Sequence, residues 1–352
     1  MIARKQETPP ETTSTSSTTA ATRSLPDLPH EAPSPGLQGS ADEVVRALVL
    51  GQWKECLRTV ELISSREDPE DVHRMRVGVR RLRALLKLFR SLLPRQVKGP
   101  RTDLRRVGRA AGAVRDLDVL LDRLPEAAQD LALNSRHSFV LLEQILRKQR
   151  DRFHRRLRRV LESPSFLRLK LRIPRVMAQG PVSDAPRRKR PLDAAGSFVA
   201  EGSQVLLAQV QRVLRRSRKC LRIQDPERLH RLRIEVKTLR YCLDVLSPSV
   251  GQPAQKALRS LVELQTILGE VQDDVVAVDQ VRTLSQHRSG RDLSSARGVT
   301  DLLVKRWKKR LKKLHRKLPK KLRKLDGRRW RVLLSRLRVL RTSTESAASA
   351  HG

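Results

Sequence analysis

The sequence predicts an all-α protein that is built from two related halves. Apolar residues recur at spacings of three and four along most of the chain, and no stretch keeps the period of two that a β-strand requires. A long block of sequence also occurs twice, at a constant offset of 157 residues. Because one offset holds across several helices, it indicates duplication of a whole helical unit. We therefore expect two helical bundles with approximate twofold symmetry.

The repeat is clearest where each copy opens a helix. Both copies begin with Asp-Pro-Glu, at Asp68 and at Asp225, and nine of the first sixteen positions are identical. The aspartate can cap free backbone N–H groups, the proline fits the first helical turn, and the glutamate suits the positive helix end. In later helices the same offset relates Leu104, Gly112, Val114 and Asp116 to Leu261, Gly269, Val271 and Asp273.

Composition divides the chain into five parts. Residues 1–40 hold 13 Ser and Thr and six Pro, which cannot bury a core, so we expect a disordered tail. Residues 180–196 contain three prolines between two glycines and are expected to link the halves, 41–179 and 197–342. Residues 343–352 should fray. Prolines are expected to break helices at several points, among them Pro125 and Pro248.

The charge balance restricts the class of partner. The chain carries 75 Lys and Arg against 37 Asp and Glu, a formal net charge of +38. So large a positive charge repels itself unless a polyanion is bound. The expected partner is therefore nucleic acid, polyphosphate or an anionic surface. No apolar run approaches the ~18 residues of a membrane span, and the first ten residues lack the apolar stretch of a secretory signal. We expect a cytoplasmic protein of undefined oligomeric state, and the three unpaired cysteines indicate neither disulfides nor zinc.

Each repeated helix carries a basic row beside its apolar stripe, about 100° around the helix axis. A solvated helix face usually mixes both signs of charge at i,i+4, whereas these rows keep one sign and occur twice. We interpret them as anion-binding rows at the rim of a cleft, where partial exclusion of water strengthens binding. The rows include His73, Arg76, Arg80, Arg83 and Lys87 in the first copy and His230, Arg233, Lys237 and Arg240 in the second. Further candidates, on later helices, are Lys148, Arg152 and Arg155 with their counterparts Lys305, Lys309 and Lys312.

The matched histidines, His73 and His230, are best explained as hydrogen-bond donors at the ends of the rows. A plain structural role is the second interpretation. A zinc site would need two or three further ligands close by, and no H-x3-H or H-E-x-x-H spacing occurs. We therefore expect neither a metal nor a cofactor.

An acidic pair follows a glycine in each copy, and these carboxylates admit two interpretations, a divalent metal site or ion pairs with neighbouring Arg and Lys. In so basic a protein we expect ion pairs that hold the cations in place. The sequence contains no P-loop and no nucleophile–base pair, so we expect binding and no catalysis. A metal-dependent phosphohydrolase is the weaker alternative, and it would use Asp116, Asp118, Asp273 and Asp274.

The scarcity of aromatic residues bears on which polyanion is bound. Single-strand binders stack bases on aromatic side chains, and only nine aromatic residues occur among 352. No common nucleic-acid-binding motif is present. Rows of Arg and Lys without aromatics suit a ligand that is all phosphate, namely inorganic polyphosphate. The alternative is a nucleoid-type protein that binds DNA or RNA without sequence preference, and secondary nucleic-acid binding is compatible with either interpretation.

Four segments together resemble the CHAD domain, the conserved histidine α-helical domain. They read HRMRVGVRRLRALLKLF, LRRVGRAAGAVRDLDVLL, LHRLRIEVKTLRYCLDVL and LVELQTILGEVQDD, and the resemblance spans roughly residues 41–342. It implies two four-helix bundles, related by a pseudo-twofold axis, around a central basic channel or groove. It also implies polyphosphate binding without turnover and, in bacteria, association with polyphosphate granules as a targeting or scaffolding protein.

The family's basic motif positions fall on residues of both copies. They are His73, Arg76, Arg80, Arg81 and Arg83 in the first copy and His230, Arg233, Lys237 and Arg240 in the second. Thr238 stands in the second copy at the position that Arg81 occupies in the first, so we expect the two halves to bind the ligand with unequal strength. Many family members also carry a CYTH triphosphatase domain with an E-x-E-x-K strand. The first 40 residues contain no such motif, so the resemblance implies no hydrolytic activity.

Overall fold

The computed structural model describes residues 39–129, 135–179, 197–287 and 291–349, within a unit that spans Pro33–Gly352. The expected linker at 180–196 and all but the end of the expected tail lie outside the described residues. Within them the regular structure is helical, apart from one isolated bridge between Ser40 and Ser197, which confirms the all-α prediction.

The described residues contain five α-helices in each half, one more than a four-helix bundle. The first half has α1 (Ala41–Ser65), α2 (Pro69–Leu88), α3 (Lys98–Ala128), α4 (Arg136–Glu162) and α5 (Pro164–Ala178). The second half has α6 (Phe198–Arg222), α7 (Pro226–Val250), α8 (Gln252–His287), α9 (Arg291–Arg323) and α10 (Arg328–Ser349).

The repeated helices begin as the sequence predicts. The Asp68 carboxylate accepts a hydrogen bond from Glu70 N at 2.8 Å, and the Asp225 carboxylate accepts one from Glu227 N at 2.9 Å. Each cap satisfies a backbone donor that has no partner within the helix and is worth about 1 kcal/mol. The starts of α2 and α7 are therefore set at equivalent positions.

Three expected helix ends differ from the observed ones. Pro125 lies inside α3 and Pro248 inside α7, so the breaks expected at these residues were wrong. A proline cannot donate to the carbonyl four residues earlier, so each helix loses one backbone hydrogen bond there without ending. The last helix continues to Ser349, beyond the expected fraying point at 342, through a segment in which alanine favours helix.

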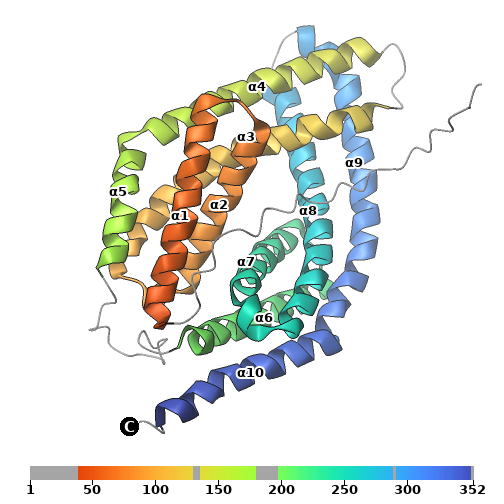
Figure 1. Cartoon of the computed structure of the whole chain (residues 1–352). Helices are drawn as coiled ribbons and strands as arrows, with labels where there is room; N and C mark the ends of the chain where they lie inside the picture. Colours follow the sequence, from red (N-terminus) through yellow and green to blue (C-terminus); the bar gives the residue numbers. More distant parts are fainter. Residues whose placement is uncertain (1–38, 130–134, 180–196, 288–290, 350–352) are drawn as a thin grey trace, which may run out of the picture. The chain divides into compact units, whose positions relative to one another are not determined.

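Helices related by the repeat contact one another across the two halves. The contacts join α1 to α6, α2 to α7, α3 to α8 and α4 to α9 (Figure 1). The bridge between Ser40 and Ser197 likewise joins residues that the 157-residue offset relates. Such contacts between equivalent surfaces are those that approximate twofold symmetry produces.

The apolar stripes of the repeated helices are buried, as predicted. Each buried aliphatic or aromatic side chain contributes about 1.5–3 kcal/mol. A second core cluster joins α3 and α4 to α8 and α9 through residues such as Leu117, Leu142, Val281 and Trp307, so both halves share it. The buried stripes are Val72, Met75, Val79, Leu82, Leu86 and Phe89 on α2 and Leu229, Leu232, Val236, Leu239 and Leu243 on α7.

None of the described helices is both long enough and apolar enough to cross a membrane.

Candidate anion-binding site

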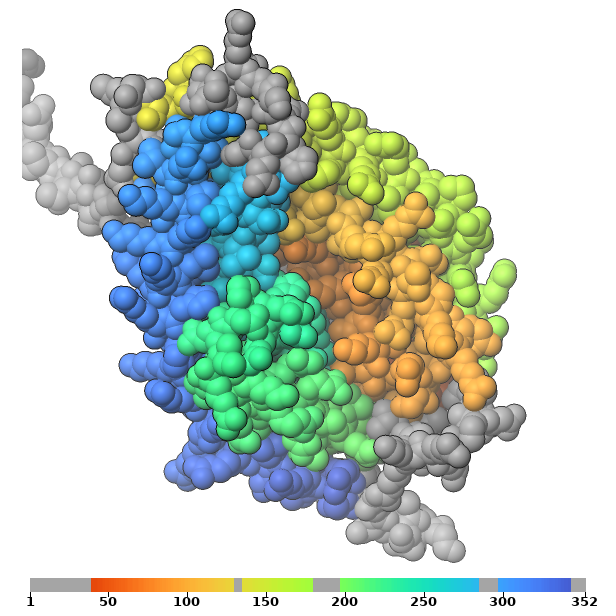
Figure 2. All heavy atoms as spheres, turned by 180° about the vertical axis from the view of Figure 1, so that it is seen from behind, coloured from red at the N-terminus to blue at the C-terminus, as the bar shows by residue number. Residues whose placement is uncertain are grey.

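The basic rows of α2 and α7 meet where the two halves contact each other. Burial of the apolar stripes places the neighbouring cations at the boundary of the core, and the side chains of Arg76 and Arg233 are only 26% and 14% exposed. Arg80 and Lys237 are also partly buried. We call Arg76, Arg80, Arg233 and Lys237 the central cluster. Figure 2 shows α2 set back between α3 on one side and α7 and α8 on the other.

Burial and the nearby like charges lower the pKa values of Lys237 and Arg233 in the central cluster. Burial lowers the pKa of Lys237 well below its ordinary value, and the nearby Arg80, Arg233 and Arg76 act in the same direction. Burial also lowers the pKa of Arg233, against the attraction of Asp273. A cation in such a place is stabilised by a bound anion, because the desolvated charge then gains a partner.

His73 extends the central cluster towards α3. The pKa of His73 is lowered to about 4. Burial is the largest cause, and the neighbouring positive charges act in the same direction, in the order Arg115, Arg80, Arg76 and Lys237. Its Nδ1 is buried and has no hydrogen-bond partner in the described part of the chain. The imidazole is therefore neutral near pH 7 and keeps an unused polar atom beside the cations.

His230 occupies a different environment from His73, although the repeat relates them. It is exposed, and its Nδ1–H donates to Gln272 Oε1 at 2.6 Å. The counterpart of Gln272 in the first half is Arg115, the cation beside His73. Our sequence interpretation treated the histidines as equivalent and did not assign Arg115, although its change to Gln272 in the repeat is visible in the alignment of the two copies.

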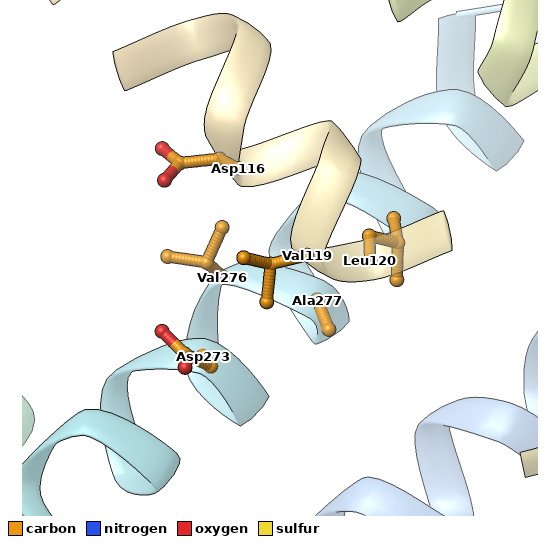
Figure 3. A pocket seen from close by; sticks show the side chains of 6 residues that line it. All are labelled: Asp116, Val119, Leu120, Asp273, Val276 and Ala277. Carbon is orange, nitrogen blue, oxygen red and sulfur yellow. The ribbon is translucent and has the colours of Figure 1, made fainter. Parts of the chain in front are cut away.

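The carboxylates of Asp116 and Asp273 partly balance the central cluster. Asp116 Oδ1 lies 3.0 Å from Arg76 Nη1, and Asp273 Oδ1 lies 3.8 Å from Arg233 Nη2. In Figure 3, the two aspartates project to the same side of the crossing between α3 and α8. They line a pocket of ≈ 10 Å³, room for about one water molecule, whose walls are repeat-related. The lining residues are Asp116, Val119 and Leu120 with their counterparts Asp273, Val276 and Ala277.

The neighbouring carboxylates are also held by arginines. Asp118 Oδ1 accepts from Arg150 Nε at 3.0 Å, and Asp274 is bonded to Arg123. These contacts confirm the ion pairs expected from the sequence. Among the residues that the structure describes, no group of three or more His, Cys, Asp or Glu side chains is arranged to hold a metal ion.

Tyr241 connects the two halves beside the central cluster, and the sequence interpretation gave it no role. Arg80 Nε donates to the Tyr241 hydroxyl at 2.7 Å, and the guanidinium carbons of Arg80 and Arg81 lie 6.0 and 5.4 Å from the ring centroid. The ring is buried. Thr238, the counterpart of Arg81, is buried too, and its hydroxyl donates to Ile234 O at 2.9 Å. This region therefore holds two arginines from the first half and no matching cation at Thr238.

The remaining predicted residues of α2 and α7 lie at the ends of the rows. Arg83 is partly buried between α2 and α3, and Lys87 is exposed. Arg240 Nε lies 3.9 Å from the Asp244 carboxylate of its own helix. These residues continue the rows away from the central cluster.

The predicted cations of the later helices lie on α4 and α9. Lys148, Arg152 and Arg155 are exposed on α4, and Lys312 is exposed on α9. A pocket of ≈ 540 Å³ on α9 and the end of α3 is lined by Ala127, Leu302, Lys305, Arg306, Lys309, Arg310 and Lys313. Lys305 and Lys309 thus line a pocket different from the one between Asp116 and Asp273, whereas Lys312 is not among its lining residues.

Comparison with known proteins identifies relatives of this chain. The family model described as CHAD domain matches residues 47–282, more than half of the chain. The crystal structure of the CHAD domain from the plant Ricinus communis aligns with a TM-score of 0.66 and 24% sequence identity, over 81% of this chain and 92% of that one. PptA from Streptomyces chartreusis aligns with a TM-score of 0.59 and 19% identity, over 78% of this chain and 99% of that one. At these identities the two structures show a shared fold. No curated protein matches the sequence.

Proposed function

The chain belongs to the CHAD domain family, and we propose on that basis that it binds inorganic polyphosphate without turning it over. The observation that carries the proposal is the central cluster. It brings together four cations, and two carboxylates, Asp116 and Asp273, balance only part of their charge. The low dielectric of a partly buried site strengthens the attraction between these cations and a bound anion. Arginine adds forked, bidentate contacts to phosphate oxygens.

The surroundings of Tyr241 favour polyphosphate over nucleic acid. Its ring is buried and already contacts Arg80 and Arg81, so it offers no free face on which a base can stack. A ligand without bases uses the guanidinium groups and needs no such face. We propose that His73, Arg76, Arg80, Arg81, Arg233 and Lys237 contact the phosphates, with Arg83, His230 and Arg240 further along the rows.

We further propose that α2 and α7 form facing walls of a basic groove between two bundles with pseudo-twofold symmetry. The exposed cations of α4 and α9 would then be secondary contacts for a long chain. Turnover finds no support in this arrangement, because Asp116, Asp118, Asp273 and Asp274 are each paired with an arginine. Binding without turnover suits a protein that is targeted to cytoplasmic polyphosphate granules or that acts as a scaffold on them.

A competition titration tests the proposed function. Labelled long-chain polyphosphate is bound to the protein at about 150 mM salt, where nonspecific phosphate contacts are weakened. Duplex DNA is then added in increasing amounts, from a matched phosphate concentration to a large excess. We expect DNA in large excess to leave the polyphosphate bound, and we expect no release of inorganic phosphate with Mg²⁺ or Mn²⁺ present. If each DNA phosphate displaced polyphosphate as effectively as a polyphosphate phosphate does, the result would contradict the proposal and support the nucleoid-type alternative.

A further inference from the structure

Helix α3 carries a row of arginines that its counterpart α8 lacks. Arg101, Arg105 and Arg109 follow one another at i,i+4 spacing and therefore share one face of α3. We call these three residues the α3 arginine row. Their counterparts in α8 are Leu258, Val262 and Thr266, none of which is charged.

Arg83 of α2 connects the α3 arginine row to the central cluster. Its Nη1 lies 3.8 Å from the place that a Cβ on Gly108 would occupy, so the guanidinium rests on the α3 backbone beside Arg109. Burial lowers the pKa of Arg83 most, and the positive charges of Arg105, Arg101 and Arg109 lower it further. Arg80, three residues earlier on α2, belongs to the central cluster. A continuous path of cations thus runs from the cluster to the start of α3.

Arg83 and the α3 arginine row lack carboxylate partners among the residues that the structure describes. In the part of the chain that the structure describes, none of Arg83, Arg101, Arg105 and Arg109 forms an ion pair, and Arg105 and Arg109 are exposed. The second half differs at the same place. Arg240, the counterpart of Arg83, lies 3.9 Å from Asp244, whereas the counterpart of Asp244 is Lys87. Unpaired like charges on one face disfavour the helix pair unless an anion is bound across them.

We propose that Arg83 and the α3 arginine row form an extension of the anion site that exists in the first half alone. A long polyphosphate chain then leaves the central cluster along α2 and α3, and not along α7 and α8. This inference rests on the proposed function and adds a direction to it. A short oligophosphate would occupy the central cluster without reaching the extension. The extension therefore raises the affinity for long chains only.

The test compares two triple variants of equal charge. Arg101→Gln/Arg105→Gln/Arg109→Gln removes the α3 arginine row. The control, Arg215→Gln/Lys219→Gln/Arg222→Gln, removes three exposed cations of α6 that have similar spacing and no ion pair among the described residues. Affinity for tripolyphosphate and for long-chain polyphosphate is measured over a series of salt concentrations. Arg105→Gln/Arg109→Gln, which alters exposed residues only, replaces the triple variant if the latter does not fold.

We expect the α3 variant to bind long-chain polyphosphate about tenfold more weakly, with a salt dependence reduced by about two units in log–log slope, and to bind tripolyphosphate unchanged. The control should keep its long-chain affinity within about twofold. Two results would overturn the extension while leaving the proposed function intact. One is an equal loss of long-chain affinity in the α3 variant and the control. The other is a loss of tripolyphosphate affinity in the α3 variant as large as its loss of long-chain affinity. Failure of the unmodified protein to bind polyphosphate at all would overturn both.

Discussion

His73 gives the site its own pH dependence. The pKa of its imidazole is lowered from 6.5 to about 4 by burial, then by Arg115, Arg80, Arg76 and Lys237. Between these two values the unfolded chain binds a proton that the folded protein does not, so the free energy of unfolding falls as the pH drops from about 6.5 to about 4. Because the side chain is only partly buried, we expect a contribution of about 1 kcal/mol at pH 5.

The variant His73→Gln isolates this contribution. It should lose less stability than the unmodified protein between pH 7.5 and pH 5 in urea unfolding, whereas the two should differ little in this respect above pH 7. His154 and His315 also have lowered pKa values, and they contribute equally to both proteins. An identical loss of stability in the variant would show that His73 is protonated without cost in the folded state.

The residues that carry the site could be predicted from the sequence only in part. One-sign rows at helical spacing identified Arg76, Arg80, Arg233 and Lys237, because periodicity alone shows that they share a face. The contact between Arg80 and Tyr241 joins two helices 161 residues apart in sequence, and no local pattern contains it. The α3 arginine row was visible as a spacing of four, but its relation to Arg83 depends on how closely α2 packs at Gly108.

At the scale of the helix, α3 and α8 restrain the cations of α2 and α7. Asp116 and Asp273 neutralise one arginine each and also repel an incoming phosphate chain. We therefore expect Asp116→Asn/Asp273→Asn to strengthen polyphosphate binding by a factor of about three while costing about 1 kcal/mol of stability. Calorimetric titration and thermal unfolding of the same preparation measure the two effects. Weaker binding would instead show that the carboxylates hold the arginines in the orientation that binding requires.

Helix boundaries show where sequence patterns stop being informative. The caps at Asp68 and Asp225 depend on two adjacent residues and were predictable from them. Pro125 and Pro248 were expected to end helices, yet α3 and α7 continue for a few residues because tertiary packing outweighs the loss of one hydrogen bond. The resemblance implied four-helix bundles, and α5 and α10 bring each half to five helices.

For the described unit as a whole, duplication explains the fold better than it explains the site. The repeat accounts for the contacts between α1 and α6, α2 and α7, α3 and α8, and α4 and α9. The charges have diverged between the copies, however, with Arg115 opposite Gln272 and Lys87 opposite Asp244. Shared apolar positions keep the two halves packed, while unequal cations give a bound chain one favoured direction.

The central claim is that the cations at the contact of α2 and α7 bind polyphosphate as a site, beyond the effect of net charge. The most direct measurement is a titration of long-chain polyphosphate into Arg76→Gln/Arg233→Gln and into Arg215→Gln/Lys219→Gln, at about 150 mM salt. Glutamine keeps a polar side chain at both positions, and both variants lose two positive charges. We expect the first to bind at least about tenfold more weakly than the second, since it removes charge-assisted contacts in a partly buried site. Equal affinities would contradict the account and show that only total charge matters.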